Sequence, residues 1–296
     1  MRHAIILLFT LLLLFPVNEV FAHPGSGIVV DREGNVYFVD TGSGVWKVDR
    51  EGTLTRLSGP ALHWMAIDVD SRLEDVPLPH FSSGGATVTR VGTNPTLILS
   101  SDFPLAVGPD GSLYYPGFES GRMKLFRFSP SGSTSVFATL PPARSSTGEI
   151  RWRNGVAVSP DGTIYYTEDR TVRKISSNGD VSTVIGNLEV PGCDPAEGVA
   201  PELGPYCRGL DADSAGTVYV AATGCRAVLK ITPDKKVTTV LQAKSPWSPT
   251  GVALHGSDLY VLEYLHTEGS NRREWLPRVR KVFSDGRIET IATVKR

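Results

Sequence analysis

The stretch RNGVAVSPDGTIYYTED, residues 153–169, decides the fold of this chain. Two apolar runs of strand character flank a Pro-Asp-Gly, and glycine tolerates the positive φ that a tight turn between two strands requires. The stretch therefore predicts a β-hairpin. Asn154 stands directly before the first run, and its role depends on how often the phrase recurs and on what replaces it.

The phrase recurs along the whole chain. Units begin at residues 27, 64, 104, 155, 209 and 251, which places them 37 to 54 residues apart. The copies read GIVVDREGNVYFVD, WMAIDVDSRLEDV, LAVGPDGSLYYPG, GVAVSPDGTIYYTED, GLDADSAGTVYVAA and GVALHGSDLYVLEY, and the second of them keeps the strand but not the turn. Repeats of this length without a helical pattern are typical of propeller blades and other β arrays.

A second turn in most units joins the last two strand signals, as in SPSGST and FSDGRI. Six units of four strands predict an all-β fold, a six-bladed β-propeller of four-stranded antiparallel blades. A pair of β-sandwiches is the alternative. Units one and six each contain a fourth strand of their own, TLTRL and RIETIATV. We therefore expect the ring to close by packing between blades, without a strand exchanged between the termini.

These repeats resemble the NHL-repeat and SMP-30/gluconolactonase-like propellers, and the resemblance covers nearly all of residues 25–294. It implies the fold, while the scaffold hosts lactonases, lyases and binding modules alike. In SMP-30-like enzymes the phrase carries an Asn ligand for a divalent cation, which implies that role for Asn154. The carboxylate ligands of that family would align near Ser26 and Arg208. An arginine has no lone pair for a cation and repels it, so we do not expect this metal site to be intact.

The first 22 residues, MRHAIILLFTLLLLFPVNEVFA, predict a secretory signal peptide, because a basic start precedes an apolar run and small residues at the cleavage site. A membrane anchor is the alternative, although the run is short for a bilayer core of about 30 Å. We expect cleavage near Ala22, export to the periplasm or outside, and a single propeller domain over 23–296. The net charge of −1 without a basic run argues against nucleic acid as a partner. A monomer is expected.

Long connections at 140–153, 186–208, 243–249 and 264–278 lie on the face opposite the tight turns, and such loops often carry sites. The position before each first strand opens onto that face. The six residues there are Ser26, His63, Phe103, Asn154, Arg208 and Thr250, and carboxylates at the ends of second strands add Asp40, Glu119, Glu168, Asp169 and Glu263. Together they predict a ligand-binding cup at the channel mouth.

In this cup Arg208 can clamp an anion or oxyanion, and His63 can act as a base. The structural alternatives are a salt bridge of Arg208 to Glu168 or Glu119, packing of His63 on Trp64, and a strand-start role for Asn154. A second metal hypothesis uses the amine and imidazole of His23, exposed by cleavage, with His63 as copper or zinc ligands. His80 and His266 could add to a three-His zinc site.

Two loop features complete the predictions. Arg272, Arg273 and Trp275, in the connection 264–278, are predicted to fold over the cup as a lid. One disulfide is expected among the three cysteines. Cys193–Cys207 is preferred, which would leave Cys225 reduced, and Cys207–Cys225 is the competing pairing.

The function predicted from the sequence is an exported propeller that binds a small polar or anionic ligand, or a partner segment, at the channel mouth. A metal-dependent hydrolase or lyase of the lactonase type, using calcium or zinc, is the alternative.

Overall fold

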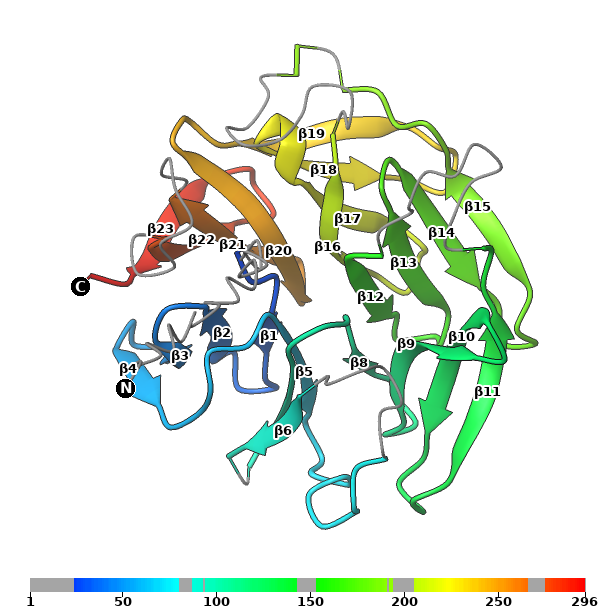
Figure 1. The fold of residues 1–296 in the computed structure, drawn as a ribbon. Helices are drawn as coiled ribbons and strands as arrows, with labels where there is room; N and C mark the ends of the chain where they lie inside the picture. The colour runs from blue at the N-terminus through cyan, green and yellow to red at the C-terminus, as the bar shows by residue number, and fades with distance from the viewer. Residues whose placement is uncertain are drawn as a thin grey trace, which may run out of the picture.

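The structure is a computed structural model that describes residues 24–79, 87–92, 94–142, 153–190, 192–193, 205–265 and 275–295. Six antiparallel sheets stand around a central channel, which confirms the predicted six-bladed β-propeller (Figure 1). Each innermost strand contacts the innermost strand of the next blade, in the order β1, β5, β8, β12, β16, β20 and back to β1.

Blades one, three, four, five and six have four strands each. Blade one holds β1 Ile28–Val30, β2 Val36–Asp40, β3 Gly44–Val48 and β4 Leu54–Leu57. Blade three holds β8 Ala106–Val107, β9 Leu113–Glu119, β10 Arg122–Phe128 and β11 Thr134–Thr139. Blade four holds β12 Gly155–Val158, β13 Ile164–Glu168, β14 Thr171–Ile175 and β15 Val181–Ile185.

Blade five holds β16 Cys207–Ala212, β17 Val218–Ala222, β18 Ala227–Ile231 and β19 Val237–Gln242, with a short 3₁₀ turn, η2, at Thr223–Cys225. Blade six holds β20 Trp247–His255, β21 Asp258–Leu265, β22 Pro277–Val282 and β23 Ile288–Thr293. Blades one and six are each built from one continuous segment, so the ring closes by packing of β1 against β20. No strand is exchanged between them within the described residues, as predicted.

Blade two differs from the prediction of four strands. Its described strands are β5 Trp64–Asp68, β6 Val88–Val91 and β7 Thr96–Ser100, in the spatial order β5-β7-β6. The buried Asp68 carboxylate accepts the Leu73 N–H at 2.6 Å, and Leu73 is fully buried. This bend replaces the tight turn that the other first strands enter, and β7 then pairs with β5 in the middle of the sheet.

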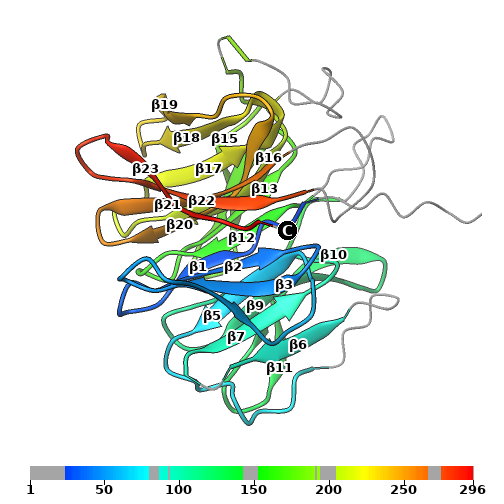
Figure 2. The same ribbon diagram turned by 90° about the vertical axis from the view of Figure 1, so that its left-hand side faces the viewer.

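Burial follows the place of each strand in its blade. The second strands of blades one and four, VYFVD and IYYTE, are buried along their whole length because neighbouring blades cover both of their faces. The fourth strands lie at the rim, and LTRL of β4 has two exposed positions in its centre. In the side view the hairpins β18–β19 and β22–β23 turn on the same, left-hand face (Figure 2). We call this the turn face and the opposite one the loop face.

Candidate functional site: the loop-side mouth of the channel

Successive residues of the first strands form rings at increasing depth in the channel, because each strand runs from the loop face to the turn face. The entrance ring is Ser26, His63, Phe103, Asn154, Arg208 and Thr250. The glycine ring is Gly27, Trp64, Pro104, Gly155, Gly209 and Gly251. The collar is Ile28, Met65, Leu105, Val156, Leu210 and Val252, and the channel ring is Val29, Ala66, Ala106, Ala157, Asp211 and Ala253. The pairing register supports this alignment, since channel-ring residues face a tyrosine of the second strand in five blades.

Glycine is required at four positions of the glycine ring because the next blade approaches the backbone closely. A Cβ on Gly155 would lie 2.4 Å from the Arg208 carbonyl oxygen, and one on Gly251 would lie 2.2 Å from the Ser26 carbonyl oxygen. Both distances are shorter than any van der Waals contact, so no larger side chain fits unless the backbone moves. The Asn-Gly of the repeat therefore combines an entrance residue with a packing residue.

The segment 24–27, which we call the strap, ties three blades together at the mouth. Arg208 donates to the Pro24 carbonyl at 2.5 Å, and the Thr250 hydroxyl donates to the Gly25 carbonyl at 2.6 Å. On the other side the Ser26 N–H donates to the His63 carbonyl at 2.7 Å. Blades five, six and two thus converge on the strap, whose residues are all buried.

Between the strap and blade four lies a small cavity of about 50 Å³. Of the entrance ring, Ser26 and Asn154 line it, together with Trp64 of the glycine ring. The Trp64 indole N–H donates to the Asn154 carbonyl at 3.1 Å, which links blade two to blade four across the mouth. The Asn154 amide donates to the Cys207 carbonyl at 3.5 Å. The cavity has room for a few waters or for the head group of a ligand.

The other entrance residues lie beside this cavity rather than in its wall. His63 contacts the Trp64 ring edge-on, with the ring centres 5.5 Å apart, and its Nδ1 lies 2.8 Å from the Ser101 carbonyl. A protonated Nδ1 donates to that carbonyl, which places the lone pair of the neutral imidazole on Nε2. Phe103 packs on Tyr115 in the core between blades two and three. Only two of the six entrance-ring residues, Ser26 and Asn154, therefore line the same cavity.

Arg208 is only 4 % exposed, and burial lowers the pKa of its guanidinium. The salt bridge between Arg208 and Glu168 that the sequence left open is not among the ion pairs of Glu168 in the described chain. Glu168 accepts from Arg153 at 2.9 Å and from Arg173 at 2.6 Å, within its own blade. Glu119, the other proposed partner, lies at the exposed end of β9.

The remaining carboxylates are also engaged locally. Asp40 accepts from the Gly42 N–H at 2.9 Å and from the Ser43 hydroxyl, which closes the turn between β2 and β3. Glu263 is fully buried and accepts from Arg278 at 2.5 Å, and burial raises the pKa of its carboxyl. Asp169 adopts a positive φ of 51° in the turn after β13, where its carbonyl accepts the Cys207 N–H.

This donor set does not fit a divalent cation at the mouth. Calcium takes six to eight oxygen ligands that include carboxylates. Here the entrance ring carries a guanidinium instead of a carboxylate, and the nearby Glu168 is neutralised by two arginines. Among the described residues, no group of three His, Cys, Asp or Glu side chains could hold a metal ion. The hypotheses that use His23, His80 and His266 lie outside the described residues.

The disulfide differs from the prediction. Cys193 pairs with Cys225, and Cys207 is the free thiol of the described chain, so the preferred Cys193–Cys207 bridge is wrong. Cys207 opens the inner strand β16, is fully buried and pairs with Ala222, whereas Cys225 lies in the turn η2 at the end of the blade. Burial raises the pKa of the Cys207 thiol to about 12. The prediction of one bridge within 193–225 is confirmed.

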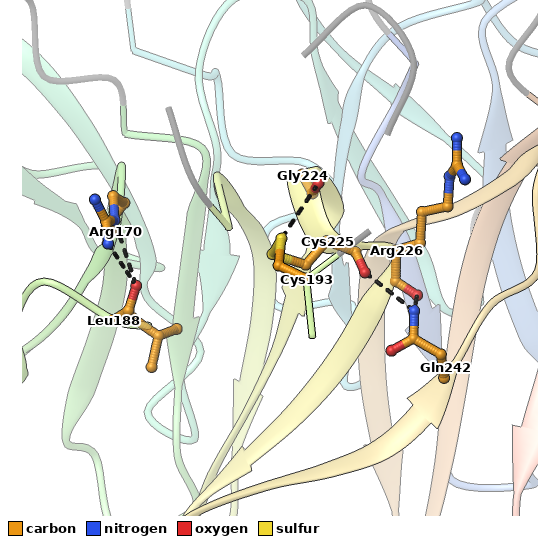
Figure 3. Close-up of a disulfide and its surroundings, with 7 residues drawn as sticks. All are labelled: Arg170, Leu188, Cys193, Gly224, Cys225, Arg226 and Gln242. Atoms are coloured by element: carbon orange, nitrogen blue, oxygen red, sulfur yellow. Dashed lines mark hydrogen bonds between the residues drawn. A yellow bond between two sulfur atoms is a disulfide. The ribbon is translucent and has the colours of Figure 1, made fainter. Parts of the chain in front are cut away.

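Hydrogen bonds hold the chain near both cysteines of the bridge (Figure 3). Arg170 donates to the Leu188 carbonyl, and the Gln242 amide donates to the Cys225 carbonyl at 3.1 Å.

The lid prediction is corrected in one part. Trp275 is buried in the core cluster that contains Val39 and Tyr264, so it does not cover the cup. Arg272 and Arg273 lie outside the described residues.

Sequence reasoning missed Trp64 and the strap as parts of the mouth. Trp64 was detectable, because it replaces the glycine that stands at this position in four of the six repeats. The strap had no signal of its own, since its contacts join residues that are far apart in the sequence.

A six-bladed propeller whose first strands open on a loop-bearing mouth is the class that this fold and site define. Residues 105–264, more than half of the 296, match the SMP-30/gluconolactonase/LRE-like region. The chain therefore belongs to the SMP-30/gluconolactonase/LRE-like family, as the sequence resemblance implied. Among curated proteins none matches the sequence.

Solved structures share the architecture. A luciferin-regenerating enzyme is 18% identical with a TM-score of 0.54, over 92% of this chain and 94% of that one. A gluconolactonase from Xanthomonas campestris is 15% identical with a TM-score of 0.52, over 80% of this chain and 81% of that one. Regucalcin from Agrobacterium tumefaciens, a calcium-binding protein, is 15% identical with a TM-score of 0.50, over the same shares. Likenesses at these identities show the fold alone.

Proposed function

We propose that this protein binds a small polar or anionic ligand at the loop-side mouth of the channel. The observation that carries the proposal is the buried guanidinium of Arg208 in the entrance ring. A guanidinium stays charged at every physiological pH and holds planar anions with two parallel hydrogen bonds. A ligand anion at the mouth would gain charge-assisted hydrogen bonds from this group.

Asn154 supplies the second part of the proposed site. It lines the cavity and lies in the blade next to Arg208, and a Cβ on Gly155 would meet the Arg208 carbonyl. An amide contributes neutral hydrogen bonds, which are weaker than those of a charged group. A head group such as a carboxylate would thus take its charge from Arg208 and its orientation from Asn154. The body of the ligand, or a partner segment, would extend toward the loop face.

A hydrolase of the lactonase type is the second candidate, because the family includes a protein described as a gluconolactonase. The donor set of the mouth does not fit a metal ion, so any hydrolysis would rely on His63 as base and Arg208 as oxyanion partner. His63 Nε2 would take a proton from water, and the guanidinium would stabilise the negative oxygen that develops on the carbonyl.

We also propose that the protein is an exported monomer. A disulfide is compatible with export. No helix of the described residues is long and apolar enough to cross a membrane.

A binding and activity panel on the purified chain tests the proposal. Gluconate and inorganic phosphate serve as anionic probes, glucose as the neutral probe, and gluconolactone as the substrate probe with and without chelator. We expect the purified chain to bind an anion saturably and not to bind glucose. Equal binding of glucose would contradict it, and chelator-sensitive lactone hydrolysis would favour the metal-dependent alternative instead.

A further inference from the structure

The channel holds a second, larger cavity on the other side of the collar. It measures about 190 Å³ and is lined by collar and channel-ring residues and by the residues that follow them toward the turn face. The two cavities share the collar, a ring of six large apolar side chains. We call this second cavity the turn-side chamber. Val30, Ile67 and Val107 at its end are partly exposed, so it is reached from the turn face.

One residue of the channel ring departs from the other five. The equivalent positions carry Val29, Ala66, Ala106, Ala157 and Ala253, and blade five carries Asp211. Since the six blades repeat one another, five of them serve as internal references for the sixth. They show that a small apolar residue satisfies the packing at this depth. Apolar packing alone therefore does not require a carboxylate at this position.

Asp211 is the one ionisable residue among those that line the chamber in the described chain. Its Oδ2 accepts the Leu254 N–H at 2.8 Å, and its Oδ1 accepts the Ala212 N–H at 2.8 Å. An ionised carboxylate offers about four lone-pair positions, so two backbone donors leave room for more. Desolvation raises the pKa of this carboxyl to about 6, and repulsion from Asp213 adds to the effect. The two backbone hydrogen bonds oppose this rise, and the repulsion from Asp213 is the part that a positive partner would relieve.

We propose that the turn-side chamber is a second binding site, which takes a small alkylammonium ion on the Asp211 carboxylate. The site is separate from the mouth and does not depend on the function proposed there. An ammonium head brings three donors to the carboxylate. The alkyl body packs on the alanines of the channel ring and on the collar. A cavity of about 150 Å³ holds a benzene molecule, so the chamber accommodates a chain or ring of similar size.

A metal ion fits this chamber less well. Calcium and magnesium bind through several oxygen ligands, usually with more than one carboxylate or with retained waters. The chamber offers one carboxylate among apolar side chains. An organic cation uses both of these features, because its charge meets Asp211 and its carbon atoms meet the apolar ring.

The test is a titration of the full chain with n-butylammonium at pH 7.5, followed by calorimetry or thermal shift. 1-Butanol is the neutral probe of the same length, and sodium, magnesium and calcium chloride are the metal arms. We expect saturable butylammonium binding at least tenfold tighter than that of butanol. Asp211→Asn should abolish this preference, and Arg208→Ala, at the mouth, should leave it unchanged.

A second variant guards against a folding defect at Asp211. Ala106→Val narrows the chamber from another blade, and valine already stands at the equivalent position 29. It should weaken butylammonium binding several-fold without touching the carboxylate. Equal binding of butylammonium by the parent and Asp211→Asn would overturn the proposal. So would a response to metal chlorides in place of butylammonium, or equal affinities for butylammonium and butanol.

Discussion

The glycine that precedes each collar residue sets how closely two blades can approach. In blades one, four, five and six this position is glycine, and in each case a neighbouring backbone occupies the space of a Cβ. Blades two and three carry Trp64 and Pro104 instead. The same residue position therefore holds the ring tight on one side and shapes the mouth on the other.

Gly155→Ala tests this packing role. Its Cβ would lie 2.4 Å from the Arg208 carbonyl and 2.8 Å from Leu210 Cδ2, so the blades must separate. We expect a loss of about 1–3 kcal/mol in the free energy of unfolding. Gly186→Ala is the control, because its Cβ would meet only Thr183 Cγ2 at an ordinary 3.6 Å. Urea denaturation of both variants gives the answer, and equal stabilities would show that the contact yields at no cost.

Asp211 gives stability a specific dependence on pH. Its pKa in the folded protein is about 6, above the ordinary value of 3.8 for an aspartate, so the folded state binds the proton more tightly. The stabilisation is fully present below about pH 4 and is lost as the pH rises through about 6. Relative to Asp211→Asn, the parent should lose about 2–3 kcal/mol between pH 4 and pH 7.5. A difference between the two proteins that stays constant over this range would show that the carboxyl is not perturbed.

Among the elements, blade five is the one that is cross-linked. The bridge Cys193–Cys225 joins the connection after blade four to the turn η2 between β17 and β18. Cys207 lies in the same apolar cluster as both of these cysteines but begins β16, where its backbone N–H bonds to Asp169. Its position in the inner strand keeps its thiol within the core.

Removing the bridge should destabilise the protein without affecting Cys207. For a separation of 32 residues the chain-entropy model gives about 3–4 kcal/mol. We expect the double variant Cys193→Ser, Cys225→Ser to melt at a lower temperature and to be insensitive to reductant. The parent should lose the same amount of stability on reduction. Thiol counting on the denatured parent should give one free group, and three free groups would disprove the bridge.

The elements also show how far the sequence could predict the structure. The glycine-containing turns and alternating runs predicted five blades correctly, because hairpins are encoded by residues close together in the chain. Blade two lacks that turn, so its strand order β5-β7-β6 was not predictable from the repeat. The cysteine pairing failed for the same physical reason. It depends on which loop crosses which blade, and spacing along the chain does not contain that information.

For the whole molecule, ring closure places residues from both ends of the sequence at one mouth. Repeat phasing correctly aligned the first strands of the six blades. It could not predict that the strap would bind Arg208 and Thr250, or that Trp64 would reach Asn154 across the mouth. These contacts arise only when the sixth blade meets the first. For Phe103 and Glu119 the repeat pattern gave the position in the blade but not the surroundings of the side chain. Phe103 packs in the core, and Glu119 is exposed at the end of β9.

The central claim, an anion site built on Arg208, is tested most directly by comparing two single variants in one titration with gluconate. A charge-assisted hydrogen bond contributes about 1.5–3 kcal/mol and a neutral one about 1 kcal/mol. Arg208→Ala should therefore weaken binding by more than about tenfold, and Asn154→Ala by only a few-fold. Arg170→Ala, which removes an arginine that bonds the Leu188 carbonyl, is the control and should bind as the parent does. The reverse order, with Asn154→Ala losing metal and activity and Arg208→Ala neutral, would contradict the account, as would parental affinity in both variants.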